Sequence, residues 1–138
     1  MTDKKILIVD DDPDVRLGLN VRLKANHYET FFATDAITSL IEARKHEPDL
    51  IILDLGLPGG DGFVVMERLK TIPSLAVIPI IVVSARDANA NQERAIKAGA
   101  KSFLQKPVDN AELLATIRRA LGEPPKRGKP DVYDLGTL

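Results

Sequence analysis

The sequence predicts an α/β fold built on a doubly wound parallel sheet of five strands. Short β-rich apolar runs alternate with segments of helical period five times along the chain, and this alternation is typical of right-handed βαβ crossovers. Three of the runs are apolar at nearly every position, which indicates strands covered by helices on both faces. The expected strands are Lys5–Val9, Glu29–Phe32, Leu50–Leu53, Ile78–Val83 and Ser102–Gln105.

Three of the helices are predicted from acidic residues that can cap them. Asp12 precedes Pro13, which predicts an N-cap followed by proline at the first helical position. Asp61 can cap a helix after the third strand, and Asp109 stands three residues before Glu112, the spacing of a capping box. Each of these helices then carries apolar residues on one face, so each can pack against the sheet.

Glycines mark the ends of two helices and the end of the domain. Gly99 and Gly122 stand where a left-handed residue ends a helix. We therefore expect one domain over residues 3–121, followed over residues 122–138 by a tail or linker rich in proline, glycine and charge. Two interpretations of the last residues stay open: a disordered end, or a segment that docks on this domain or a neighbour. The apolar side chains that would dock are Val132, Tyr133, Leu135 and Leu138.

The composition excludes several classes of function. At 138 residues and 44% hydrophobic content, the chain fits one globular domain. It has no cysteine, hence no disulfide and no thiolate metal site. No apolar run approaches the roughly 20 residues of a membrane span, so we expect a cytoplasmic protein without membrane insertion. With 19 basic and 20 acidic residues, the net charge is −1, which gives no field to attract nucleic acid.

Polar residues follow four of the five predicted strands. They are Asp10 and Asp11 after the first strand, Asp54 after the third, Ser84 after the fourth and Lys106 after the fifth. Because the carboxyl ends of parallel strands meet at one edge of a sheet, we expect these side chains to lie together. Three carboxylates within about 5 Å repel by roughly 3 kcal/mol per pair at an effective dielectric constant near 20. One lysine cannot neutralise them, and oxygen ligands favour Mg²⁺, with Mn²⁺ as the alternative ion.

This set of groups suits phosphoryl transfer. A divalent ion and the lysine can screen an incoming phosphoryl group, while the serine hydroxyl can donate a hydrogen bond to one of its oxygens. The remaining carboxylate can then attack the phosphorus. The residues alone therefore indicate phosphate chemistry at the carboxyl edge of the sheet.

Five stretches of the chain match one family. The chain resembles response-regulator receiver domains over about residues 3–121. No single stretch identifies the family, but the five stretches together, in this order and at this spacing, are specific for it. The resemblance implies a flavodoxin-like or CheY-like sheet with strand order 2-1-3-4-5. The matching stretches are Ile6–Pro13, Asp54–Gly62, Ile80–Ala85, Gly99–Ala100 and Phe103–Pro107.

The resemblance implies a role for each residue of the acidic edge. Asp54 is expected to accept a phosphoryl group from the phosphohistidine of a sensor histidine kinase or a histidine phosphotransfer protein. Asp11 would bind Mg²⁺ directly and Asp10 through water, with Asp54 and the backbone carbonyl of Gly56 as further ligands. Lys106 would contact the phosphoryl oxygens. The protein would assist its own phosphorylation and dephosphorylation without being an enzyme in the usual sense.

The resemblance also implies a switch and a docking surface. Phosphorylation would draw the Ser84 hydroxyl toward the phosphate and turn the Phe103 ring inward. The face of the fourth helix, fifth strand and fifth helix would then change its protein partners, among them a downstream effector. Leu17 and Val21, one helical turn apart, and Pro107 are candidates for docking the kinase of a bacterial two-component system. The Lys106–Pro107 bond is expected to be cis.

Two positions near the phosphoacceptor depart from the family's usual residues. Gly56 is smaller than the side chains commonly found two residues after the phosphoacceptor, which leaves the phosphoryl group more open to water. Arg86, two residues after Ser84, could pair with the phosphoryl group or shield it. The two effects oppose each other, so the sequence leaves the direction of the phosphoryl lifetime open.

Two other functions share parts of this pattern. A Mg²⁺-dependent phosphatase of the haloacid-dehalogenase type also uses a nucleophilic aspartate, but it needs a second carboxylate two positions later, where this chain has Gly56. A flavodoxin-like electron carrier needs a phosphate-cradling loop after the first strand, where the run Asp10–Asp12 would repel the phosphate. The resemblance implies instead a binding module, either a stand-alone receiver or one cut from a longer regulator. The oligomeric state is not readable from the sequence.

Overall fold

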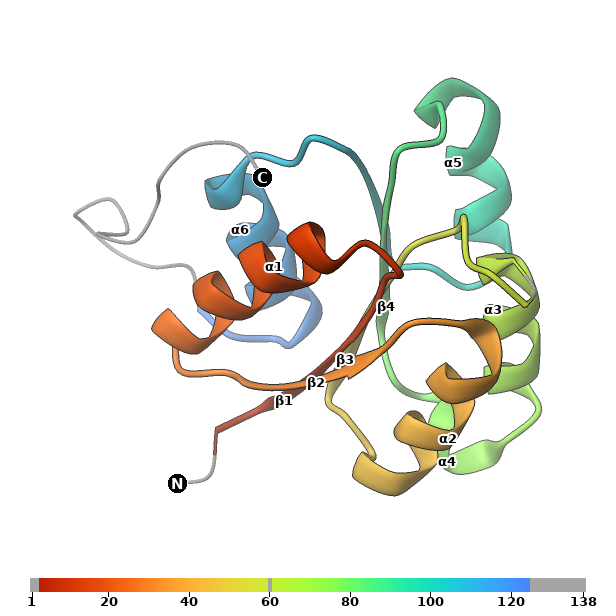
Figure 1. Ribbon diagram of the computed structural model, residues 1–138, viewed down its shortest axis with the longest axis horizontal. Coiled ribbons are helices and arrows are strands. Elements are labelled where there is room, and N and C mark those ends of the chain that lie inside the picture. Colours follow the sequence, from red (N-terminus) through yellow and green to blue (C-terminus); the bar gives the residue numbers. More distant parts are fainter. Residues whose placement is uncertain (1–2, 60, 125–138) are drawn as a thin grey trace.

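Five parallel strands form one sheet in the computed structural model, which describes residues 3–59 and 61–124 (Figure 1). The strands are β1 (Lys5–Val9), β2 (Glu29–Ala33), β3 (Leu50–Leu53), β4 (Ile80–Ser84) and β5 (Ser102–Gln105). They lie side by side in the order β2-β1-β3-β4-β5, and every neighbouring pair is parallel. The predicted fold class and strand order are therefore confirmed. Three strands have the predicted bounds, and β2 extends one residue past the predicted end at Phe32.

Helices cover both faces of this sheet, as its continuous apolar runs predict. Side chains alternate between the two faces of a strand, so Ile6 and Ile8 of β1 join one core cluster while Leu7 and Val9 join the other. The first cluster lies under α1 and α6, and the second under α2 to α5 (Figure 1). The helices are α1 (Pro13–Ala25), α2 (Ala36–His46), α3 (Gly62–Lys70), α4 (Pro73–Ala76), α5 (Ala88–Lys97) and α6 (Asn110–Ala120).

An aspartate is the N-cap residue of every described helix of nine residues or more. In each case the carboxylate of the N-cap residue accepts a hydrogen bond from a backbone N–H of the first turn, which satisfies a donor that the helix itself cannot pair. This confirms the predicted caps Asp12, Asp61 and Asp109. Asp35 and Asp87 cap α2 and α5 in the same way.

The chain differs from the predicted elements just before the fourth strand. The sequence does not predict α4, a single turn that begins at Pro73 without a side-chain cap. The Ile78 N–H donates to the Leu75 carbonyl at 3.1 Å to close this turn, and Pro79 has no N–H for the ladder. The strand therefore begins at Ile80 and not at Ile78. As a consequence, the fourth and fifth helices of the expected switch face are α5 and α6 here.

The end of the domain is held by Glu123. Gly99 and Gly122 have positive φ angles of 115° and 70°, as predicted for residues that follow helices. Beyond Gly122, the Glu123 carboxylate accepts a hydrogen bond of 2.6 Å from the Tyr28 hydroxyl; burial and this contact raise the pKa of Tyr28. The segment 131–138, whose docking the sequence leaves open, lies outside the described residues. Within the described ranges, none of the helices is long and apolar enough to span a bilayer.

Candidate functional site

The backbone of the sheet brings Asp10 and Asp54 side by side. Strands β1 and β3 are neighbours with Val9 opposite Leu53, and an aspartate follows each strand directly. The Asp54 N–H donates to the Val9 carbonyl at 2.9 Å, and the Asp10 N–H donates to the Ala33 carbonyl at 3.1 Å. These bonds continue the sheet one residue past the strands, so both carboxylates are fixed at its carboxyl edge.

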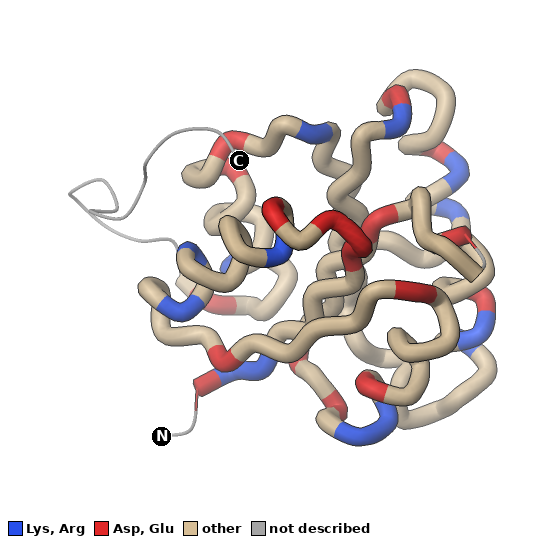
Figure 2. Tube along the Cα trace, in the orientation of Figure 1, with Lys and Arg blue, Asp and Glu red and all other residues tan. Residues whose placement is uncertain are grey.

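Three carboxylates meet at this edge. One oxygen each of Asp10, Asp11 and Asp54 lies within 4.8 Å of the others. Asp10 and Asp54 are buried, with exposed fractions of 3% and 8%, whereas Asp11 is exposed. Figure 2 shows acidic residues gathered where β1 gives way to α1. The carboxylates of the first and third strand ends thus converge as the parallel sheet predicts.

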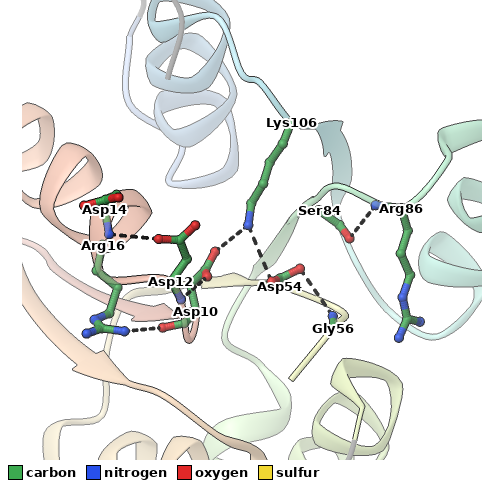
Figure 3. A network of polar contacts seen from close by, with 9 residues as sticks. All are labelled: Asp10, Asp12, Asp14, Arg16, Asp54, Gly56, Ser84, Arg86 and Lys106. Carbon is green, nitrogen blue, oxygen red and sulfur yellow. Dashed lines mark hydrogen bonds and ion pairs between the residues drawn. The ribbon is translucent and has the colours of Figure 1, made fainter. Parts of the chain in front are cut away.

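Lys106 reaches into the carboxylates from the end of β5. Its Nζ lies 2.7 Å from Asp10 Oδ2 and 3.5 Å from Asp54 Oδ2 (Figure 3). The backbone holds this residue in place, because the Lys106 N–H donates to the Ser84 carbonyl at 2.8 Å. The Lys106–Pro107 peptide bond is cis, as the resemblance implies. The ammonium therefore lies between two carboxylates that come from two different strand ends.

The charges of the site do not balance. Burial raises the pKa of Asp10, and this effect outweighs the lowering by the Lys106 ammonium and by the Asp12 N–H, which donates to Asp10 Oδ1 at 2.9 Å. Burial acts to lower the pKa of Lys106, but the hydrogen bond to Asp10 and the charges of Asp10 and Asp54 raise it overall. Lys106 therefore keeps its proton, and three carboxylates still face one ammonium. A cation would relieve the remaining repulsion.

The carboxylate spacing fits an octahedral Mg²⁺ ion. Mg²⁺ binds oxygens at about 2.0–2.1 Å, so two ligand oxygens are about 2.9 Å apart when adjacent and about 4.2 Å apart when opposite. Carboxylate oxygens of Asp10, Asp11 and Asp54 lie within 4.8 Å of one another, close enough to face one ion directly or through a water. All three donors are carboxylates, which suits a hard cation. Gly56 lies beside them, because its N–H donates to Asp54 Oδ1 at 3.3 Å.

Ser84 stands on the other side of Asp54 from Asp10 (Figure 3). Its side chain is buried, and its Oγ accepts a hydrogen bond of 3.2 Å from the Arg86 N–H. A hydroxyl that accepts one bond still has its proton to donate, so Ser84 can give a hydrogen bond to a group on Asp54. The polar ends of β1, β3 and β5 therefore meet around Asp54, and Ser84 lies on the remaining side in Figure 3.

The Arg86 side chain turns away from Asp54. Its Nη1 lies 3.2 Å from Asp61 Oδ2, and in Figure 3 the guanidinium points away from the acidic cluster. The sequence identifies Asp61 only as a helix cap, so it misses this second role. It also misses Arg16, whose Nη1 donates to the Asp10 carbonyl at 2.9 Å and steadies the loop after β1. No spacing or motif in the sequence marks either contact.

Gly62 is required by the close approach of α3 to the Asp54 loop. A Cβ at this position would lie 2.7 Å from the Asp54 carbonyl oxygen and 2.8 Å from Leu55 Cα. The Gly62 N–H instead donates to the Leu55 carbonyl at 2.8 Å. At Gly56, by contrast, a Cβ would meet nothing within 4 Å, so this position has room for a side chain.

The remaining candidate residues lie around this centre. Phe103 is buried, and its ring belongs to the core cluster on the α2 to α5 side of the sheet. Leu17 and Val21 are exposed on α1, at 62% and 56%, and Pro107 is exposed beside Lys106. A small cavity of about 170 Å³, lined in part by the Lys106 stem, lies next to α1. A wider groove of about 570 Å³ lies between α2 and α3 and contains none of these residues.

A family model described as "Response regulator receiver domain" matches residues 6–118. Among curated proteins, the response regulator PleD of Caulobacter vibrioides (strain NA1000 / CB15N) is 40% identical over 115 residues, which are 83% of this chain and 25% of PleD. The chain spans about half the length of several other curated relatives. The similarity therefore concerns one part of each of these proteins.

Solved structures give the same match over most of the chain. The chemotaxis response regulator CheY4 of Vibrio cholerae has a TM-score of 0.79 and 29% identity, covering 86% of this chain and 99% of CheY4. The receiver domain of the sensor histidine kinase PA1611 from Pseudomonas aeruginosa PAO1 has a TM-score of 0.81 and 26% identity, covering 88% and 99% of the two chains. That structure holds a magnesium ion coordinated in its active-site cleft.

Proposed function

The chain belongs to the family of response regulator receiver domains, and from this premise we propose that Asp54 accepts a phosphoryl group from a phosphohistidine. The observation that carries the proposal is the position of Lys106 Nζ, 2.7 Å from Asp10 and 3.5 Å from Asp54, beside three carboxylates within 4.8 Å of one another. The donor is a sensor histidine kinase or a histidine phosphotransfer protein. The role is that of a cytoplasmic signalling domain in a bacterial two-component system.

In the proposed transfer, a carboxylate oxygen of Asp54 attacks the phosphorus of the phosphohistidine. An oxygen–phosphorus bond forms, the nitrogen–phosphorus bond breaks, and its electron pair stays on the imidazole of the donor. Lys106 would contact the incoming phosphoryl oxygens, and the Ser84 hydroxyl would donate a hydrogen bond to another of them. The same groups serve hydrolysis, in which water attacks the phosphorus and the carboxylate leaves.

We assign the metal ligands to the acidic edge. Asp11 and Asp54 would bind Mg²⁺ directly and Asp10 through water, and the Gly56 carbonyl would be the last ligand that the protein supplies. Mn²⁺ is the alternative ion. The bound ion would neutralise charge on the phosphoryl group during transfer. The spacing of the carboxylates supports this assignment, as does the magnesium ion in the PA1611 receiver domain.

We propose Ser84 and Phe103 as the switch residues, and the face made by α5, β5 and α6 as the surface whose protein partners change. A downstream effector protein would bind there in one of the two states, without direct contact between this chain and nucleic acid. Leu17, Val21 and Pro107 would dock the kinase or phosphotransfer protein, since Leu17 and Val21 are exposed on α1 and Pro107 is exposed beside Lys106.

Incubation with acetyl phosphate and Mg²⁺, followed by intact mass measurement, tests the proposal. The wild-type protein should gain one phosphoryl group, and the Asp54→Asn variant should gain none. Chelation of the divalent ion should also abolish the gain. Equal gain in the variant would reject Asp54 as the acceptor, and turnover of a phosphate ester would favour a phosphatase instead.

A further inference from the structure

An ion pair joins the two loops that flank Asp54. Arg86 Nη1 lies 3.2 Å from Asp61 Oδ2, and the two side chains are 37% and 38% exposed. The other oxygen of Asp61, Oδ1, accepts the N–H of Phe63 at 2.6 Å and caps α3. Arg86 lies between β4 and α5, two residues after Ser84. The pair therefore links the loop between β4 and α5, which carries Arg86, to the start of α3.

Arg86 is also tied to the hydroxyl expected to move. Its backbone N–H donates to Ser84 Oγ at 3.2 Å, so a displacement of that hydroxyl toward Asp54 would break this bond. Its guanidinium points away from Asp54 in Figure 3. Movement of Ser84 toward a phosphoryl group would thus release one of the contacts that hold Arg86 in its position beside Asp61.

Gly56, whose N–H donates to Asp54 Oδ1, adds no side chain beside Asp54. A Cβ at Gly56 would meet nothing within 4 Å, so position 56 presents no side chain to cover this approach. A phosphoryl group carries close to two negative charges and three strong acceptor oxygens, against one charge on the Asp61 carboxylate. Guanidinium groups bind such oxygens through paired hydrogen bonds. A phosphoryl group on Asp54 would therefore compete for Arg86.

We propose that Arg86 exchanges partners, pairing with Asp61 before phosphorylation and with the phosphoryl oxygens on Asp54 afterwards. This inference rests on the proposed function of Asp54. In its second position the guanidinium covers the side that Gly56 leaves open and slows the attack of water on phosphorus. Asp61 acts as the competing partner, so it shortens the lifetime of the phosphoryl group.

The exchange predicts opposite effects for the two halves of one ion pair. Asp61→Asn should lengthen the half-life of the phosphorylated protein by about two- to fivefold, the range open to a half-exposed ion pair. Asparagine caps helices as well as aspartate does, so α3 should stay intact. Arg86→Gln should shorten the half-life, and Arg86→Lys should give an intermediate value because lysine keeps the charge without the paired donors.

The decisive measurement is the half-life of the phosphorylated mass after removal of acetyl phosphate, in both single variants and in the double variant. Asp61→Asn should have no effect once Arg86 is glutamine. If the ion pair only braces the loops, both single variants break the same contact and change the half-life in the same direction, which overturns the exchange. The same holds if Asp61→Asn acts equally in the Arg86→Gln background. Absence of any phosphorylated wild-type protein overturns the proposed function itself, and the exchange with it.

Discussion

Asp10 is a buried carboxylate whose negative charge is only partly neutralised by its surroundings. It is 3% exposed, and its ammonium partner, Lys106, also contacts Asp54. A buried charge lowers stability unless it is paired, and the raised pKa of Asp10 reflects this. A neutral side chain of the same size would relieve the strain but could not hold a cation. Stability and metal binding therefore make opposite demands at this position.

The Asp10→Asn variant is expected to be more stable than wild type at pH 7 when no divalent ion is present, because it removes a carboxylate whose pKa burial raises. Because the pKa of Asp10 is raised by folding, its contribution to stability is present at low pH and is lost as the pH rises through the folded pKa. The advantage of the variant should therefore shrink toward about pH 4. Urea unfolding at the two pH values measures the difference.

The same comparison in excess Mg²⁺ provides the control. Ligand binding stabilises a protein in proportion to its affinity, so Mg²⁺ should raise the unfolding free energy of wild type more than that of Asp10→Asn, which keeps the direct ligands Asp11 and Asp54 but loses the charge of Asp10. Equal stabilisation of both proteins by Mg²⁺ would remove Asp10 from the metal site.

Gly62 and Gly56 form a matched pair for a second prediction, since both flank Asp54. Gly62→Ala should lower the unfolding free energy by about 1–3 kcal/mol, because the new Cβ would overlap the Asp54 carbonyl and Leu55. Gly56→Ala should stay within about 0.5 kcal/mol of wild type, because its Cβ meets open space. Thermal unfolding of both variants checks this. A larger loss at position 56 than at 62 would contradict the described packing of α3.

At the residue scale, the sequence predicted which carboxylates would cluster but not how the surrounding arginines would pair. Strand ends of a parallel sheet must converge, so Asp10 and Asp54 could be placed from β1 and β3 alone. Arg86 and Asp61 are 25 positions apart and meet through the rotamer of a long side chain, which no spacing encodes.

Helix α1 is the element that offers a surface beside the site. Leu17 and Val21 lie one turn apart on it and are both more than half exposed. Replacing both by lysine should slow phosphotransfer from the cognate kinase by about tenfold or more, if they supply a central part of the docking contact. Phosphorylation by acetyl phosphate should be unaffected, because the small donor needs no docking surface.

Ile37 and Ile41 on α2 provide the control for that prediction. They have the same spacing and similar exposure, 66% and 55%, but they belong to the groove between α2 and α3. Lysine at both positions should leave transfer from the kinase unchanged. An equal slowing by the two double variants would show that α1 holds no special surface.

At the element scale, strands and long helices were predictable because each carries a local signal. Continuous apolar runs located β1 and β3 to the residue, and the aspartate caps located the starts of α1, α3 and α6. Helix α4 carries no such signal, since four residues show no period and its N-cap makes no side-chain hydrogen bond. The Ile78 N–H closes this turn by donating to the Leu75 carbonyl, which moves the start of β4 from Ile78 to Ile80. The missed helix and the wrong strand start therefore have one cause.

At the scale of the whole molecule, the sheet connects the site to a distant face. Ser84 is the last residue of β4 and pairs in register with Gln105 of β5. The Gln105 side-chain oxygen accepts the N–H of Ala88, the first residue of α5, at 3.1 Å. Ser84 is therefore linked to β5 and α5 through two direct contacts.

Phosphorylation is accordingly expected to perturb α5, β5 and the start of α6 more than α2 and β2. Strand β2 is the far edge of the sheet, separated from β3 and Asp54 by β1, and it meets the site where the Asp10 N–H donates to the Ala33 carbonyl. Amide chemical shifts of the protein with and without acetyl phosphate, both in Mg²⁺, measure the effect. Uniform shifts over all elements, or larger shifts in α2 and β2, would argue against the α5, β5 and α6 face as the output surface.

The most direct test of the central claim locates the phosphoryl group itself. Borohydride reduces an aspartyl phosphate to homoserine, so the phosphorylated protein can be reduced, digested and mapped by peptide mass. We predict homoserine at position 54 and nowhere else, and only when acetyl phosphate and Mg²⁺ were both present. Homoserine at position 10 or 11, or an equal yield at position 54 after chelation of the ion, would contradict the account.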